Sequence, residues 1–450
     1  AEDGIRDLVR SRGLGDVYKR QTLGRYAERV KKSFWIETLG CPKNKVDSEK
    51  IAGTLLVDGM SPAEAPADAN LIVVNTCSFV EQAREESIAT VFEYSQMRSE
   101  DVQVVVTGCL AERYGEEISN SLEGDVDAIA GFGVPVNISS KPDVPKFDLL
   151  NLPRPKREEP WGYVKVAEGC DRVCGFCAIP SFRGPQRSRS ISEIREEVIS
   201  LELQEVVLVA QDLASWARDQ RESPEGIVDL VKEVSDIVPW VRLLYLYPSS
   251  LSGELVEIIA NSPVPYFDLS LQHVSGPLLR KMRRWGDGER FTKVIKDIRK
   301  IRPDAAFRTN FIVGYPGETE EDHDQLLRFL EENEIDWCGF FPYSKEAGTY
   351  AETLTEEVAE PLVMERLREL GEAQDVITEK KRDSIIGEKV TVLIESQGTG
   401  RSHREAPEID GLIYVPDTLE VGSFETVTVE EALGVDLKAV LSDSVYREVP

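Results

Sequence analysis

Residues 163–177 read YVKVAEGCDRVCGFC, a short apolar strand followed by three cysteines in the spacing C-x-x-x-C-x-x-C. The spacing places Cys170, Cys174 and Cys177 on one loop, residues 169–177, which we call the cysteine loop. Cysteine thiolates hold iron–sulfur clusters, which normally take four of them. With three local ligands, one iron stays open to a substrate, as in catalytic metal sites. The stretch therefore predicts a catalytic iron–sulfur cluster at the end of a strand.

Zinc is the structural alternative for these three thiols. A structural zinc site needs four ligands, and no further Cys or His follows the cysteine loop within a few residues. The chain holds seven cysteines, and disulfide bonds fit poorly in 450 residues without a recognisable secretory signal. The seventh, Cys338, falls within a predicted strand and is interpreted as a buried, inert thiol. The sequence thus favours iron–sulfur ligation over zinc.

The strand before the cysteine loop is the first of six apolar strands that alternate with helical segments. They cover residues 163–166, 206–209, 243–246, 267–271, 307–313 and 338–341. Six such repeats predict an α/β fold, an incomplete (β/α)6 barrel of the TIM type. Active sites of these barrels lie at the carboxyl ends of the strands, which is where the cysteine loop begins.

Upstream, near-continuous apolar runs separated by helices predict a parallel-sheet α/β domain. The runs cover residues 34–39, 71–75 and 102–107, and they are followed by Cys41, Cys77 and Cys109. A helix is expected from about Asp47, which with Ser48 can cap its N-terminus, to Gly59. Because the carboxyl ends of parallel strands share one rim, we expect the three cysteines to lie together there.

The chain after residue 387 changes to strands of period two, with Gly, Pro and Asp turns between them. Residues 390–394, 411–415 and 425–429 predict a small antiparallel β-barrel of the kind used for docking. From residue 388 to the C-terminal end there are thirteen acids against five Lys or Arg, a balance of −8. The predicted docking barrel is therefore acidic.

These patterns predict four segments. Residues 1–33 are a basic tail or a spurious extension, residues 34–145 are the parallel-sheet domain, residues 160–385 are the barrel, and residues 386–450 are the small β-barrel. A stretch rich in Pro and charge, residues 141–160, reads as a linker.

The net charge of −28 argues against a protein that mainly holds nucleic acid, because phosphate binding needs a basic excess. No apolar run approaches the length of a membrane span, and no basic-then-apolar start marks a signal peptide. We therefore expect a soluble, cytoplasmic protein with no membrane partner. A basic protein suits this surface better than free RNA.

The cysteine loop at a barrel mouth resembles that of the radical S-adenosylmethionine (radical SAM) superfamily. The resemblance implies that the open iron of a 4Fe-4S cluster binds the amino and carboxylate groups of S-adenosylmethionine. One-electron reduction then cleaves this cofactor to a 5′-deoxyadenosyl radical. Cys170, Cys174 and Cys177 are accordingly the expected catalytic ligands.

The upstream motifs TLGCPKN (38–44), NTC (75–77) and TGC (107–109) resemble those of methylthiotransferases. The C-terminal barrel resembles the TRAM domain of this family. The resemblance covers the chain from about residue 34 onward. It implies that Cys41, Cys77 and Cys109 hold a second 4Fe-4S cluster linked to sulfur delivery, and that the radical removes hydrogen from the substrate carbon.

Two branches of this family compete for the assignment. One modifies adenosine in transfer RNA, and the other modifies the β-carbon of an aspartate in protein twelve of the small ribosomal subunit. The segments GCPKN (40–44) and CAIPSFRG (177–184) resemble the ribosomal-protein branch more closely. The acidic barrel is expected to attract that basic protein and to repel phosphate, so nucleic acid is not expected as the direct substrate.

Two other functions are also consistent with parts of the sequence, and the chemistry requires an electron donor. The enzymatic alternative is a transfer-RNA methylthiotransferase, and the alternative of another class is a non-catalytic iron–sulfur protein that binds ribosomes or RNA. A purely structural cluster would gain nothing from an open iron, which speaks against the second. A reductant protein such as flavodoxin or ferredoxin is expected to supply electrons.

Further contacts to S-adenosylmethionine are expected from polar residues at strand ends and from the loops beside them. These are Phe176, Gln211, Asp212, Ser270, Gln272, Arg308, Asn310 and Gly314. Polar strand-end residues are also common in barrels without a ligand. Gly314 has two possible explanations: it lets the backbone approach the adenine closely, or it forms only a tight turn.

Overall fold

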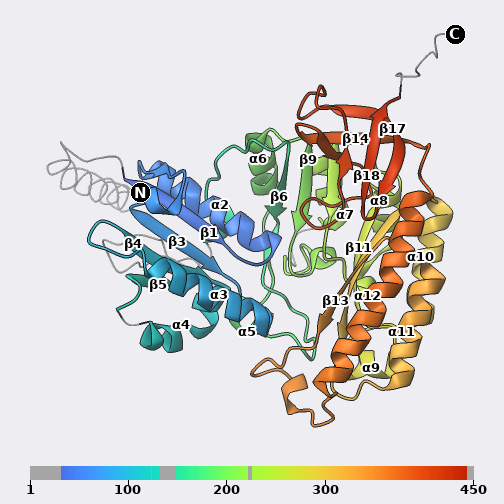
Figure 1. Ribbon diagram of the computed structural model, residues 1–450, viewed down its shortest axis with the longest axis horizontal. Coiled ribbons are helices and arrows are strands. Elements are labelled where there is room, and N and C mark those ends of the chain that lie inside the picture. The colour runs from blue at the N-terminus through green and yellow to red at the C-terminus, as the bar shows by residue number, and fades with distance from the viewer. Residues whose placement is uncertain (1–31, 123, 132–147, 221–224, 443–450) are drawn as a thin grey trace, which may run out of the picture.

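The computed structural model describes residues 32–122, 124–131, 148–220 and 225–442. The predicted N-terminal tail lies outside this part up to residue 31, as do residues 141–147 of the predicted linker and residues 443–450. Figure 1 shows three bodies: an α/β sheet at the left, a barrel toward the right, and a small β-barrel at the top.

The N-terminal body is a parallel sheet in the order β2-β1-β3-β4-β5. Its strands are β1 (Ser33–Thr38), β2 (Ser61–Pro62), β3 (Leu71–Thr76), β4 (Gln103–Gly108) and β5 (Ala128–Ala130). Helices α2 (Pro42–Val57), α3 (Glu81–Ser95) and α4 (Cys109–Ser121) pack against it. All residues of the central β3 are buried, as expected when helices cover both faces. The three predicted strands are present, and the short edge strands β2 and β5 were not predicted.

Helix α2 begins earlier than predicted. It starts at Pro42, with Cys41 in the N-cap position. The prediction that Asp47 caps the helix is wrong, because Pro42 has a preset φ that suits the first helical position. Asp47 lies inside the helix, is 2% exposed and pairs with Lys165 of the barrel. This ion pair joins the N-terminal body to the barrel.

The barrel consists of two three-stranded parallel sheets, β10-β9-β6 and β11-β12-β13, joined by a single bridge between Leu246 and Leu269. The strands are β6 (Trp161–Lys165), β9 (Glu205–Val209), β10 (Trp240–Leu243), β11 (Tyr266–Gln272), β12 (Ala306–Val313) and β13 (Trp337–Pro342). The longer helices are α6 (Ile191–Leu201), α7 (Ile227–Ser235), α8 (Gly253–Ala260), α10 (Gly288–Ile301), α11 (Glu320–Asn333) and α12 (Glu360–Asp383). Two short helices, α5 (Ile179–Arg183) and α9 (Gly276–Lys281), follow the cysteine loop and β11. The predicted six-stranded open barrel is confirmed.

The third barrel strand is displaced from its predicted position. Strand β10 covers Trp240–Leu243, whereas residues 243–246 were predicted. The chain turns at Tyr245, whose φ is +65°, so the extended backbone cannot continue through it. Only Leu246 returns to the sheet, as the bridge to Leu269.

The C-terminal body is a closed barrel in the order β14-β15-β16-β18-β17. Its strands are β14 (Lys389–Ser396), β15 (Thr399–Arg401), β16 (Ile413–Tyr414), β17 (Phe424–Leu433) and β18 (Asp436–Leu441). Two of them, β15 and β18, were not predicted. The pairs are antiparallel except for β16 with β18, which is parallel.

This small barrel packs against the starting ends of the large barrel's strands. Glu205, at the start of β9, accepts hydrogen bonds from Arg242 at 2.8 Å and Arg401 at 2.7 Å, and all three side chains are fully buried. Tyr266, at the start of β11, donates to Asp410 at 2.5 Å. The carboxyl ends of the strands, where the cysteine loop lies, are therefore at the opposite end.

None of the helices in the described part of the chain combines the length and the apolar character that a membrane span requires.

Candidate active site

The cysteine loop leaves the barrel after β6 and is held by backbone hydrogen bonds. The Cys170 N–H donates to the Gly184 carbonyl at 3.1 Å, and the Gly175 N–H donates to the Met282 carbonyl at 2.7 Å. The Gly175 carbonyl accepts from the Ala351 N–H at 2.7 Å. The segment just after the loop and two segments distant in sequence thus hold the loop in one conformation, which a set of metal ligands requires.

The three thiols of the loop are free and half-buried. Burial raises the pKa of Cys170 to about 11 and that of Cys177 to about 12. Two donors approach the sulfurs: the Arg172 N–H is 3.4 Å from Cys170 Sγ, and Arg284 Nη1 is 3.2 Å from Cys174 Sγ. Donors in these places suit sulfurs that carry negative charge, as ligating thiolates do. The loop therefore fits an iron–sulfur cluster, whose binding would release the thiol protons.

The three upstream cysteines meet at the rim of the N-terminal sheet. A Cβ built on Gly40 would lie 2.7 Å from Cys77 Sγ, so the chain before Cys41 touches the Cys77 side chain. Burial raises the pKa of Cys77 to about 12, and the neighbouring Cys109 adds to the rise. Burial also disfavours the Cys41 thiolate, but Lys43 and a nearby arginine outweigh it and lower the pKa of Cys41. These three residues form a second set of thiols.

Neither set is arranged to share one metal ion. Among the described residues, no three Cys, His, Asp or Glu side chains lie close enough together for a single ion. The cysteines of an iron–sulfur cluster bind different iron atoms, so their sulfurs stand farther apart than the ligands of one ion. Two sets of three free cysteines are compatible with two clusters.

Asn44 ties the upstream set together, a role that the sequence did not predict. Its side chain is fully buried and donates to the carbonyls of Leu39 at 2.9 Å and Thr76 at 3.0 Å. Its Oδ1 accepts from Arg183 at 3.0 Å and lies 3.6 Å from Cys109 Sγ. One amide therefore contacts all three cysteine-bearing segments. Its sequence signal was its place at the end of the TLGCPKN motif, three residues after the first upstream cysteine.

We expect Asn44→Ala to weaken the upstream cluster, because three segments lose their common hydrogen-bonding partner. Loss of such an outer partner costs about 10–100-fold in metal affinity. Iron should fall from about eight toward about four atoms per chain. Iron analysis after anaerobic reconstitution measures this. The exposed Asn261 provides the control, since Asn261→Ala should retain full iron. Unchanged iron in Asn44→Ala would contradict this role.

Arg183 connects the two sets of cysteines. It ends helix α5 and is 5% exposed. Its Nη2 is 3.0 Å from Cys109 Sγ, and its Nη1 donates to Glu168 at 2.7 Å, the residue just before the cysteine loop. Glu168 also accepts from Gln211 at 2.9 Å. The sequence contained Arg183 in a family-like motif, but only the structure places it between the two sets.

Three of the expected cofactor-binding residues have unused acceptors. Gln211 Oε1, Asp212 Oδ1 and Asn310 Oδ1 are buried and have no hydrogen-bond partner among the described residues. Asp212 also accepts from Arg172 of the cysteine loop at 2.6 Å, which places it beside the loop. Buried polar atoms normally find partners. These oxygens therefore fit a bound molecule with donor groups, such as the ammonium of an amino acid.

Three more expected residues lie near the loop or the barrel core. The Ser270 carbonyl accepts a hydrogen bond from Arg284, the side chain that also contacts Cys174. Gln272 ends β11 with a φ of +72°. Phe176 is partly buried and packs against the barrel core.

Arg308 and Gly314 contact other parts of the protein. Arg308 forms ion pairs with Asp268 at 3.2 Å and with Asp410 at 3.7 Å, on the side of the small barrel. Gly314 has a φ of +81°, and a Cβ there would collide with Val363 of α12. At Gly314 the positive φ and this helix contact already account for a glycine.

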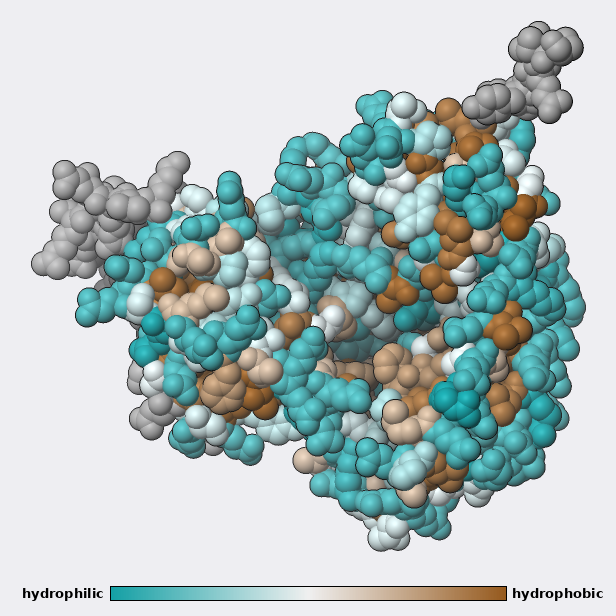
Figure 2. Space-filling view, in the orientation of Figure 1, coloured by the Kyte–Doolittle hydropathy of each residue, from teal (hydrophilic) through white to brown (hydrophobic). Residues whose placement is uncertain are grey.

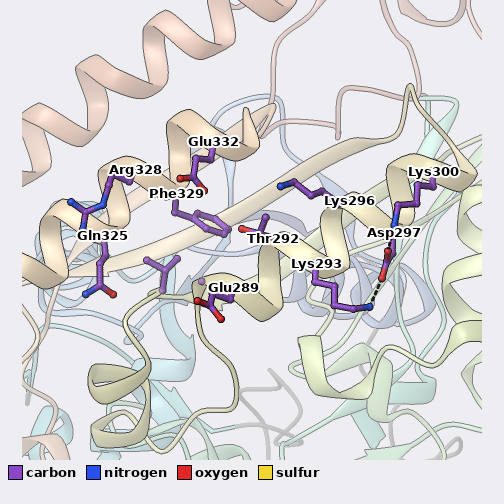
Figure 3. A pocket seen from close by; sticks show the side chains of 12 residues that line it. Glu289, Thr292, Lys293, Lys296, Asp297, Lys300, Gln325, Arg328, Phe329 and Glu332 are labelled. Carbon is purple, nitrogen blue, oxygen red and sulfur yellow. Dashed lines mark hydrogen bonds and ion pairs between the residues drawn. The ribbon is translucent and has the colours of Figure 1, made fainter.

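A separate hollow of about 620 Å³ lies between α10 and α11 (Figure 3). Its lining includes Lys293, Lys296, Lys300, Asp297 and Glu332. None of the predicted site residues lines it, and it is not part of the candidate active site.

Comparisons with known proteins divide the chain as the structure does. Residues 33–131 match a family described as uncharacterized protein family UPF0004, residues 164–330 match the radical SAM superfamily, and residues 386–441 match the TRAM domain. The ribosomal protein uS12 methylthiotransferase RimO of Aquifex aeolicus is 38% identical over 89% of this chain and 95% of its own length. The protein of the same name from Moorella thermoacetica is 38% identical over 88% of this chain and 96% of its own.

The chain belongs to the RimO methylthiotransferase family. Membership confirms the predicted resemblance to radical SAM methylthiotransferases and, among them, to the ribosomal-protein branch. It also confirms the predicted cofactor types of this family. Among solved structures, the radical SAM methyltransferase TsrM from Kitasatospora setae is similar with a TM-score of 0.44 and 13% identity, over 77% of this chain and 89% of that one.

Proposed function

We propose that this chain transfers a methylthio group to the β-carbon of an aspartate in ribosomal protein uS12. The observation that carries the proposal is the pair of three-cysteine sets, linked through Arg183, in a chain that matches uS12 methylthiotransferases over nearly their whole length. Family membership supplies the reaction type, and the two sets supply a place for each of the two clusters that the reaction uses.

In this proposal each residue set has its own task. Cys170, Cys174 and Cys177 would hold a 4Fe-4S cluster to which S-adenosylmethionine binds, and Cys41, Cys77 and Cys109 would hold the second. When bound, these groups supply the radical that removes hydrogen and the sulfur that is inserted.

The protein's own polar groups orient the cofactor and fix the position of one cysteine set relative to the other. Gln211 and Asp212, with unused buried acceptors beside the cysteine loop, hold the cofactor's ammonium group. Arg183 neutralises negative charge at Cys109 and at Glu168 and so keeps the two sets together. Phe176, Ser270, Gln272 and Asn310 line the remaining cofactor site.

The segments take distinct roles in this proposal. Residues 34–145 form the sulfur-delivering domain, residues 160–385 the radical SAM barrel and residues 386–450 the TRAM domain. Exposed acids of the TRAM domain dock the basic uS12 protein by charge complementarity. They include Glu388, Asp417, Glu420 and Glu431.

The position of the TRAM domain suits a partner that spans the molecule. Glu408 of that domain pairs with Lys45, the fourth residue of α2, whose N-cap position is Cys41. Figure 2 shows a recess between the N-terminal body and the barrel, below the TRAM domain. A loop of uS12 entering this recess reaches the cysteines while its basic body rests on the acids. The enzyme then works in the cytoplasm, with a flavodoxin or ferredoxin as electron donor.

The first experiment separates this proposal from its alternatives. Reconstituted protein, S-adenosylmethionine and dithionite are offered uS12 and bulk transfer RNA in separate anaerobic reactions, followed by mass spectrometry. We expect the added methylthio mass on an aspartate of uS12. Its appearance on adenosine would instead identify a transfer-RNA enzyme. Absence of 5′-deoxyadenosine in all reactions would favour a non-catalytic iron–sulfur protein.

A further inference from the structure

A basic surface borders the cysteine loop in this otherwise acidic chain. Residues 280–290 read RKMRRWGDGER, with five basic residues and two acids, against a net charge of −28 for the whole chain. Arg280, Arg283 and Arg290 are exposed, and Trp285 between them is 39% exposed. We call residues 280–290 the basic surface. Such a local reversal of charge is the footprint of an acidic partner.

Two of its guanidinium groups are not compensated by carboxylates. Lys281 pairs with Glu356 at 2.6 Å, and Arg290 pairs with Asp287 at 3.4 Å. Within the described part of the chain, neither Arg280 nor Arg283 lies within ion-pair distance of a carboxylate. Arg283 instead stacks over the Tyr350 ring at 4.1 Å. Two positive charges therefore remain available to a partner.

The basic surface is in direct contact with the cysteine loop. Arg284 places Nη1 3.2 Å from Cys174 Sγ, and Met282 accepts the Gly175 N–H at 2.7 Å. Val173, the residue before Cys174 in the cysteine loop, is 72% exposed and offers an apolar side chain beside the thiol that Arg284 contacts. Arginine and aromatic side chains around an apolar point are typical of protein interfaces. A protein bound here comes close to the first cluster site.

The hollow of Figure 3 also contains basic residues, but they differ from the basic surface in their ion pairs and in their contacts. Lys293 and Lys300 both pair with Asp297, at 2.6 Å and 2.7 Å, and the lining holds further acids. No hydrogen bond joins its lining to the cysteine loop in the described residues. Its lysines are therefore a suitable control for the basic surface.

We propose that the basic surface, with Val173, docks an acidic one-electron donor protein of the flavodoxin or ferredoxin class. The inference rests on the proposed function, which requires one electron for each S-adenosylmethionine cleaved. The donor's flavin or cluster would lose one electron, and the cluster that Cys170, Cys174 and Cys177 would hold would gain it. Because Arg284 of the basic surface contacts Cys174, an electron from a protein bound here has a short path to the first cluster site.

The test compares a protein donor with a small-molecule donor. Holoenzyme carrying Arg280→Glu and Arg283→Glu is driven either by reduced flavodoxin or by dithionite, and 5′-deoxyadenosine is measured. With flavodoxin, the concentration for half-maximal rate should rise about tenfold or more at low salt. With dithionite, which needs no docking surface, the rate should equal that of the wild type. Calorimetry should show flavodoxin affinity lowered by a similar factor.

Control variants keep the outcomes distinct. Lys296→Glu with Lys300→Glu makes the same change in net charge at the hollow of Figure 3, and flavodoxin dependence should stay unchanged. Arg280→Gln with Arg283→Gln removes the two positive charges without reversing them. This variant should raise the flavodoxin concentration for half-maximal rate by a smaller factor, and it replaces the glutamate variant if charge reversal disturbs folding. Unchanged flavodoxin dependence in both arginine variants, with normal dithionite activity, would overturn the docking surface alone. No cleavage by wild type with dithionite would overturn the proposed function instead.

Discussion

Replacing Cys174 with alanine should abolish cleavage of S-adenosylmethionine. The cysteine loop offers only three thiols to its cluster, and the other thiols near the site belong to the upstream set. Loss of an outer partner of a metal ligand already costs about 10–100-fold, so loss of a ligand itself should reduce cleavage by more than about 100-fold. The measurement is 5′-deoxyadenosine formed with dithionite as reductant, together with iron per chain, which should fall toward about four atoms.

Cys338→Ala is the matched control for this result. Cys338 lies on β13, is half-buried among apolar side chains of the barrel, and belongs to neither cysteine set. Burial raises its pKa well above the usual value, so it stays a protonated thiol. This variant should retain both iron and cleavage. Substantial cleavage by Cys174→Ala would show that the cysteine loop does not hold the reactive cluster.

Replacing Cys77 with alanine should separate the two halves of the reaction. The upstream set loses one ligand, while the cysteine loop, held by Gly184, Met282 and Ala351, is untouched. Cleavage of S-adenosylmethionine should stay within about twofold of the wild type, and methylthio product should fall by more than about 100-fold. Both quantities are measured in the same reaction, by chromatography and by mass spectrometry of uS12.

Cys109→Ala should behave in the same way, because Cys109 belongs to the same set and receives the Arg183 contact. If either variant still formed methylthiolated uS12 at the wild-type rate, the upstream set would have no part in sulfur insertion. If cleavage of S-adenosylmethionine were also lost, the expectation that the cysteine loop works without an intact upstream set would be wrong.

Several features were predictable because they depend on short-range chemistry. The spacing of Cys170, Cys174 and Cys177 alone indicates a shared ligand loop, and the alternation of apolar strands with helices alone indicates the barrel. The convergence of Cys41, Cys77 and Cys109 was also expected, since each follows a strand of one parallel sheet. Local periodicity and strand order are enough for inferences of this kind.

Other features depend on contacts that no local pattern encodes. The capping role expected of Asp47 failed because Pro42 starts α2 sooner and Lys165, 118 residues away, takes Asp47 as its partner. Strand β10 ends early because Tyr245 adopts a positive φ, which its residue type does not announce. Both outcomes were decided by packing around these residues.

By itself, the sequence determined the types of ligand, the barrel, the sheet and the family resemblance, because thiol spacing and apolar periodicity are local properties. Only the tertiary structure decided that Asn44 joins the three upstream segments, that Arg183 spans the two cysteine sets and that Arg284 carries the basic surface to Cys174. It also placed the TRAM domain at the end of the barrel away from the cysteine loop. The reason is physical: a hydrogen bond or ion pair between distant residues exists only once the whole chain has brought its partners within about 3 Å.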